Sequence, residues 1–86
     1  MERQTIALAT LAEILIDETT RVLGRDASFL RARLTIRRRN GTPNWDANIG
    51  VAGTAVVAAY LQALEHVKAR YDLDQLKRLT KDEGGG

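Results

Sequence analysis

The chain has 86 residues, of which 44% are hydrophobic, with no cysteine and a formal net charge of +2. This length predicts one small domain, residues 1–80, that buries only about 60–65% of its unfolded surface and gains stability from a partner subunit. The lack of cysteine excludes disulfides and thiol chemistry, and no apolar run approaches the ~20 residues of a membrane span, so we expect a cytoplasmic protein without membrane contact.

The first amphipathic segment predicts a helix over residues 10–23. Thr10 and Glu13 have the spacing of a capping box at its start, and apolar side chains then recur at helical spacing. Gly24 follows the last of them, where a residue with left-handed backbone usually ends a helix. Residues 4–8 are either one more helical turn or a short extended arm.

Residues 30–51 predict a β-hairpin with one apolar and one polar face. The alternate apolar residues are Leu30, Ala32, Leu34 and Ile36 on the first arm, and Trp45, Ala47, Ile49 and Val51 on the second. Such alternation indicates a sheet with one face on the core. Asn40-Gly41 predicts a two-residue turn that places Ile36 opposite Trp45, whereas a four-residue loop that includes Pro43 keeps the same parity and stays open.

A second helix is predicted from Thr54, as its N-cap, to about residue 71, because apolar residues recur at helical spacing and alanines raise helix propensity. Asp72 either ends this helix or caps a third one. The apolar stripe of that third helix would be Leu73, Leu76 and Leu79. We expect residues 81–86, which end in three glycines, to form a flexible tail.

These elements predict an α+β fold of the α-β-β-α type, in which two helices cover one face of a two-stranded antiparallel hairpin. Both strand edges of the hairpin are left unpaired, and unpaired edges favour association with another chain. We therefore expect a homodimer, or an accessory protein that binds a protein partner.

Residues 44–47 (NWDA) and 70–73 (RYDL) carry a resemblance. Their "NW…YDL" arrangement, with the alanine-rich segment between them, is similar to that of a set of small uncharacterised bacterial proteins. The resemblance covers most of the chain. It implies the same fold and no particular activity.

The residue types that catalysis needs are scarce. His66 is the only histidine and Ser28 the only serine, so neither a Ser-His-Asp nor a Cys-His arrangement can be assembled. Asn44, Asp46 and Asn48 share one strand face, but alternate strand residues lie about 7 Å apart, too far to enclose one cation. We therefore predict no enzyme and no catalytic, metal or cofactor-binding residues, and we interpret His66 as a solvated helix residue.

Aromatic residues and glycines have structural interpretations. Trp45 shares the parity of the apolar face, so we interpret it as a core residue opposite Ile36 and not as a stacking platform for a base. Tyr60 and Tyr71 are interpreted as core aromatics of the second helix. Residues 50–54 lack the lysine of a phosphate-binding loop and predict a strand-to-helix turn.

Arginine is concentrated in the hairpin, where Asp46 is the only acidic residue. The candidate contacts for an anion or a partner are Arg31, Arg33, Arg37, Arg38 and Arg39. Alternation places three of them on the polar face, with Asn44, Asp46 and Asn48 as cross-strand partners.

Two function classes are left open by this arginine-rich face. One is a protein-interaction module. The other is a nucleic-acid-binding protein, because a two-stranded ribbon fits the major groove of DNA and its arginines can reach phosphates or guanine edges. Further phosphate contacts would come from Lys77, Arg78 and Lys81.

Overall fold

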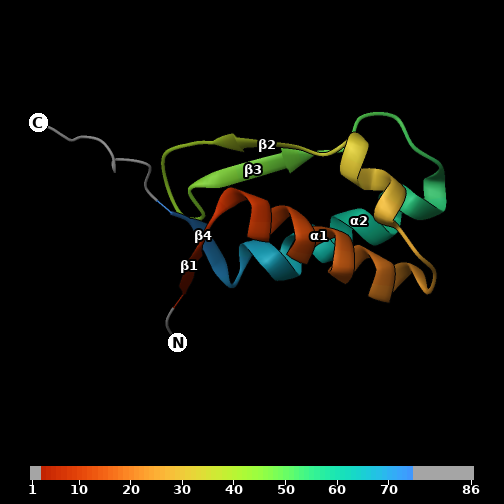
Figure 1. The fold of residues 1–86 in the computed structure, drawn as a ribbon, viewed down its shortest axis with the longest axis horizontal. Helices are drawn as coiled ribbons and strands as arrows, with labels where there is room; N and C mark the ends of the chain where they lie inside the picture. The colour runs from red at the N-terminus through yellow and green to blue at the C-terminus, as the bar shows by residue number, and fades with distance from the viewer. Residues whose placement is uncertain (1–2, 75–86) are drawn as a thin grey trace, which may run out of the picture.

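The computed structural model describes residues 3–74, which form two helices, a β-hairpin and a second pair of short strands (Figure 1). The elements in chain order are β1 (Gln4–Ile6), α1 (Leu8–Leu23), the 3₁₀ helix η1 (Ser28–Ala32), β2 (Thr35–Arg38), β3 (Trp45–Asn48), α2 (Thr54–Lys68) and β4 (Tyr71–Leu73). The predicted α+β class is confirmed. The α-β-β-α prediction did not contain β1, β4 or η1. Within residues 3–74, no helix has the length and apolar character needed to cross a bilayer.

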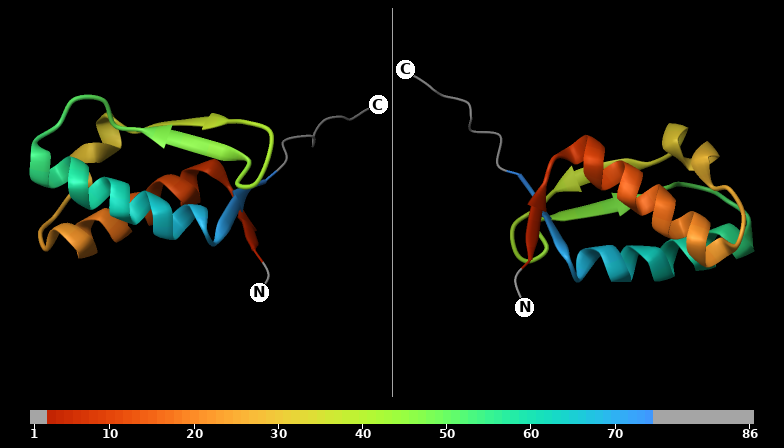
Figure 2. Two further views of the ribbon diagram at one scale, coloured as in Figure 1. Left: turned by 180° about the vertical axis from the view of Figure 1, so that it is seen from behind. Right: turned by 60° about the horizontal axis from the view of Figure 1, so that its bottom comes forward.

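Helices α1 and α2 pack side by side in opposite directions, and the hairpin lies across them as a second layer (Figure 1, Figure 2). Because the helices are antiparallel, the strand before α1 and the strand after α2 meet at one end of the molecule. There β1 and β4 pair in parallel, with Thr5 opposite Asp72. Parallel pairing of this kind is possible only between strands joined by a long crossover, which here contains the rest of the fold.

Helix α1 begins at Leu8, so the predicted capping box is wrong. Ala7 is the N-cap residue and no side chain caps it; its carbonyl oxygen accepts the Leu11 N–H at 2.9 Å. The extended strand β1 leads directly into this first turn, which resolves the two alternatives for residues 4–8. Glu13 therefore lies inside the helix, and its carboxylate is free to contact another element.

The predicted end of α1 is confirmed. Gly24 has a φ of 84°, and its N–H donates to the carbonyl oxygen of Thr20 at 2.9 Å. Glycine adopts this left-handed conformation without the steric cost that a Cβ would add.

The hairpin is shorter than predicted because its first arm changes structure. Residues 28–32 form η1, so Leu30 and Ala32 are not strand residues. Leu30 is nevertheless buried, with 1% of its surface exposed. A buried apolar residue at this position fits both a strand and a 3₁₀ turn. Alternation alone therefore predicted a first strand that begins too early, at Leu30.

The two-residue turn is wrong, and the loop is the four-residue alternative, residues 40–43. The Arg39 N–H closes it by donating to the Asn44 carbonyl oxygen at 3.0 Å. As a result Ile36 lies opposite Ala47 instead of Trp45. A type I′ turn needs a positive φ at Asn40, and within residues 3–74 only glycines have one.

The C-terminal part of the described chain is a strand where helical structure was predicted. Helix α2 has Gly53, not Thr54, as its N-cap and ends at Lys68. Leu73, predicted for a third helix, belongs to β4, because pairing with β1 stabilises an extended backbone there. Leu76, Leu79 and the predicted tail of residues 81–86 lie outside the described residues.

The hydrophobic core fills the space between the hairpin and the helix pair. Its most deeply buried apolar residues are Leu11, Leu15, Ala27, Leu30, Trp45, Ala63 and Leu73. Trp45 is completely buried, which confirms its predicted place in the core. Tyr60 is also buried, and Tyr71 packs against the same cluster from β4.

Candidate functional site

The structure separates the five candidate arginines into two groups. Arg31 lies on η1 and not on a strand, and its guanidinium donates two hydrogen bonds to the Glu13 carboxylate at 2.6 and 2.8 Å. Arg33 follows η1, and its guanidinium donates to the carbonyl oxygen of Val51. The prediction that both residues lie on the polar face of the hairpin is wrong, because η1 replaces the start of that strand.

The ion pair between Arg31 and Glu13 connects η1 to the solvent-exposed surface of α1. The hydrogen bonds that Arg31 donates lower the pKa of the Glu13 carboxyl and raise the pKa of the Arg31 guanidinium. Both side chains are about half exposed, so solvent screens the pair and its contribution to stability is small. Arg31 is therefore occupied within the chain.

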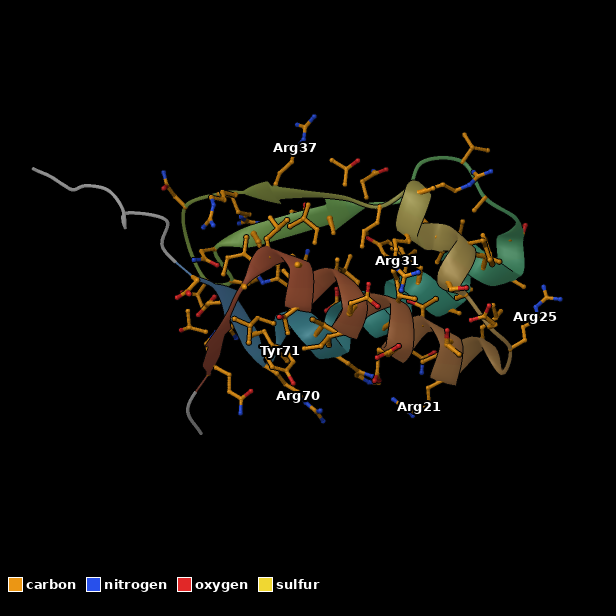
Figure 3. The ribbon with its side chains drawn as sticks, in the orientation of Figure 1. Arg21, Arg25, Arg31, Arg37, Arg70 and Tyr71 are labelled. Carbon is orange, nitrogen blue, oxygen red and sulfur yellow. The ribbon has the colours of Figure 1, made fainter. Side chains whose placement is uncertain are left out.

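The other three candidates, Arg37, Arg38 and Arg39, are called the hairpin arginines below. All three side chains are exposed, and no ion pair within residues 3–74 involves them. Arg37 lies on the outer face of the hairpin and points away from the helices (Figure 3). Their charge is consequently presented to solvent at the loop end of the hairpin.

The acidic residue opposite Arg37 does not neutralise it. Asp46 is the cross-strand partner of Arg37, but its carboxylate accepts a hydrogen bond from Lys68 Nζ of α2 at 2.9 Å. Lys68, and then the Ala47 N–H, hold the pKa of the Asp46 carboxyl below its usual range. Asp46 and Asn44 thus lie opposite Arg37 and Arg39, as cross-strand partners should, but no side-chain hydrogen bond or ion pair within residues 3–74 joins them to these arginines. Asn44 binds β4 and Asn48 accepts the Gly50 N–H at 2.6 Å.

Two open depressions flank the hairpin arginines. One, of about 380 Å³, is on the outer face of the hairpin and is lined by Thr35, Arg37, Asp46, Ala47 and Asn48. The other, of about 410 Å³, is at the loop and is lined by Arg38, Arg39, Asn40 and Asn44. Their lining is polar, without the apolar walls that usually enclose a small-molecule substrate.

A polar junction joins the hairpin to β4, and the sequence analysis did not predict it. The Asn44 carboxamide forms two hydrogen bonds with the Leu73 backbone, at 2.7 and 2.9 Å. Trp45 Nε1 donates to the Tyr71 carbonyl oxygen at 2.9 Å. The "NW" and "YDL" runs, which carry the resemblance, are thus hydrogen-bonded to one another. No local pattern in the sequence pointed to this contact, because its partners are 26 to 29 residues apart.

Arg3, the residue directly before β1, completes this junction. Its guanidinium binds both carboxylate oxygens of Asp72 and donates to the carbonyl oxygens of Lys68 and Tyr71. The bond from Arg3 and a weaker one from the Asn44 N–H outweigh burial and lower the pKa of the Asp72 carboxyl. The junction fixes strand positions, and the polar side chains that form it, Arg3, Asn44 and Asp72, are hydrogen-bonded to one another or to the backbone.

Outside the hairpin, the described residues hold no constellation with catalytic geometry. Within residues 3–74, no three histidine or acidic side chains are grouped closely enough to hold a metal ion. His66 Nδ1 lies 3.0 Å from Glu18 Oε2 on the helix surface, with about half of the histidine side chain exposed. Residues 50–53 form the turn into α2, which begins at Thr54. The basic residues Lys77, Arg78 and Lys81 lie outside the described residues.

Comparisons with protein-family models, curated proteins and solved structures found no match for this chain. The resemblance to the "NW…YDL" proteins therefore stays a prediction, and the function has to be inferred from the geometry alone.

Proposed function

We propose that this chain is a non-enzymatic protein-interaction module that docks an acidic protein partner on the hairpin arginines. One observation carries the proposal: these three arginines are exposed and form no ion pair within residues 3–74, while the Arg31 and Arg33 side chains are hydrogen-bonded to other parts of the chain. Asp46, the nearest acid, is engaged by Lys68. Arginine is enriched in protein interfaces because its planar guanidinium binds carboxylates in a bidentate manner.

Binding of an acidic polypeptide such as polyglutamate tests this proposal. The double variant Arg37→Gln/Arg39→Gln removes two of the three hairpin charges. We expect its affinity for the polypeptide to fall by at least about tenfold, which corresponds to the loss of one charge-assisted hydrogen bond. The matched control is Arg25→Gln/Arg70→Gln, which removes the same charge from exposed residues that project elsewhere (Figure 3). Equal losses in both variants would show unspecific charge attraction and refute the proposal.

A nucleic-acid ligand is the second candidate function, because the hairpin arginines protrude on a two-stranded ribbon. The structure leaves three of the predicted five arginines for phosphates, so the slope of log K against log salt on duplex DNA should be about −3 per ribbon. Tighter binding to DNA than to an acidic polypeptide of equal charge, at the same salt concentration, would favour this candidate over a protein partner.

Self-association is a further part of the proposal, and we place it at β1. The Gln4 N–H donates to the Arg70 carbonyl oxygen and the Ile6 carbonyl oxygen accepts the Asp74 N–H, both at 2.9 Å. Because backbone groups alternate along a strand, those of Thr5 point away from β4. An antiparallel pair of β1 strands related by a two-fold axis would place Thr5 opposite Thr5 and bring no like charges into register.

A further inference from the structure

Strand β2 has an outer edge with two residues whose backbone groups are unpaired. The Arg39–Asn44 pair is hydrogen-bonded, and bonded pairs alternate along an antiparallel ladder. Arg37 and Thr35 therefore bond to β3, while the N–H and C=O groups of Ile36 and Arg38 point outward. Within residues 3–74, no other hydrogen bond reaches these four groups.

Side chains occupy most of the outer edge of β4 and one group on the outer edge of β3. On β4, Asn44 occupies both backbone groups of Leu73, and the Tyr71 carbonyl oxygen accepts from Trp45. On β3, the Asp46 carboxylate accepts the Ala47 N–H at 2.9 Å. Of these three edges, only that of β2 has all of its outward backbone groups without a hydrogen-bond partner within residues 3–74.

Charge decides which chain fits this edge. A second copy of β2 would bring two sets of hairpin arginines together, and the repulsion disfavours that pairing. An extended segment with alternating acidic and apolar residues has the complementary pattern. Its acidic side chains would share the outer face with Arg37, and its apolar side chains would cover Ile36, which the hairpin leaves only partly buried. A nucleic acid, by contrast, has no peptide groups that could pair with the edge.

We propose that β2 binds an acidic segment of a partner protein in an extended conformation, adding a strand to the hairpin. The inference rests on the proposed function and narrows it: the arginines supply charge complementarity, and the Ile36 and Arg38 peptide groups supply backbone hydrogen bonds. The added strand is antiparallel to β2, the arrangement with the more favourable hydrogen-bond geometry.

The probe is a short capped peptide of alternating glutamate and valine residues. In the antiparallel arrangement its valine amides face β2 and its glutamate amides face solvent. N-methylation of the valine amides should weaken binding by at least about tenfold, whereas N-methylation of the glutamate amides should leave it unchanged within about twofold. A peptide of the same composition with all glutamates before all valines controls for charge.

The protein supplies an independent readout. We expect the amide hydrogens of Ile36 and Arg38 to exchange with solvent at least about tenfold more slowly when the peptide is bound. The reason is that hydrogen bonds to the peptide would protect these amides from exchange. The Arg37 amide already bonds to β3 and the Arg39 amide to Asn44, so their exchange serves as the internal reference.

The outcomes separate this inference from the function on which it rests. If both methylated peptides bind as the parent does, or both fail equally, or the Ile36 and Arg38 amides stay unprotected, strand addition is refuted. Docking on the arginines would still stand if Arg37→Gln/Arg39→Gln selectively weakens binding of polyglutamate. If neither the peptide nor polyglutamate binds the wild type, both proposals fail together.

Discussion

The side chain of Asn44 acts as a neighbouring strand for Leu73. Its Oδ1 accepts the Leu73 N–H at 2.7 Å, and its Nδ2 donates to the Leu73 carbonyl oxygen at 2.9 Å. A carboxamide has the donor and acceptor spacing of a peptide group, so one side chain satisfies both backbone groups on the outer edge of β4. The contact joins the base of the hairpin loop to the last described strand.

Replacement of Asn44 by alanine should destabilise the fold by about 1–3 kcal/mol, because it leaves the partly buried backbone groups of Leu73 without partners. Urea unfolding measures the change. Asn40→Ala is the control, since Asn40 is exposed in the same loop and makes no side-chain hydrogen bond within residues 3–74. Equal stability of the two variants would mean that β4 does not depend on Asn44.

Trp45 should contribute more than any other single side chain, because it is fully buried and its indole N–H is bonded to Tyr71. We expect Trp45→Ala to cost on the order of 3–5 kcal/mol, close to the total stability of many small domains. Trp45→Phe keeps most of the apolar volume and should cost less. Tryptophan emission checks the burial directly: a maximum typical of solvated indole in the folded wild type would contradict the structure.

Stability should depend on acid pH through Asp72. Arg3 lowers the pKa of this carboxyl below its ordinary value of 3.8, so the folded state binds its proton less tightly than the unfolded state does. The resulting stabilisation is fully present above that ordinary value and is lost as the pH falls through the folded-state pKa.

The measurement is urea unfolding of the wild type and of Asp72→Asn between neutral pH and about pH 3. We expect the difference in unfolding free energy to be largest at neutral pH and to shrink on acidification. A constant difference between wild type and Asp72→Asn would exclude the ion pair as its cause.

Tyr60 carries a buried hydroxyl that has no hydrogen-bond partner within residues 3–74. Burial, with a smaller effect of the Asp46 charge, raises the pKa of this phenol to about 12. Tyr60→Phe removes the unsatisfied group and retains the ring, so stability should stay the same or rise by up to about 1 kcal/mol. If thermal unfolding instead showed that Tyr60→Phe loses more than about 1 kcal/mol of stability, the hydroxyl would have a hydrogen-bond partner in solution.

Association through β1 predicts a wild type with twice the monomer mass of 9.5 kDa in sedimentation equilibrium. Thr5→Pro removes an N–H that faces away from β4, and proline is tolerated at the unpaired side of an edge strand. We expect this variant to be folded and monomeric. A wild type that stays monomeric at high micromolar concentration, or a Thr5→Pro variant that still dimerises, would remove β1 as the interface.

Local chemistry in the sequence determined several features of this protein. Gly24 ends α1 because a positive φ is easiest for glycine, and Trp45 is in the core because strand parity directs it there. The hairpin itself follows from alternation on its second arm and from the loop residues between its strands. In each case the cause lies within a few residues, so it can be recognised without the rest of the fold.

Tertiary structure decided the features whose cause lies far away in the chain. Leu73 has helical spacing, but pairing with β1 and the Asn44 carboxamide make its segment a strand. Arg31 has strand parity, but Glu13 of α1 binds it. Periodicity reports only which side chains are apolar. The partner that satisfies a backbone group or a charge is chosen by the packing of distant elements, and within residues 3–74 that packing pairs Arg31 with Glu13 while the hairpin arginines form no ion pair.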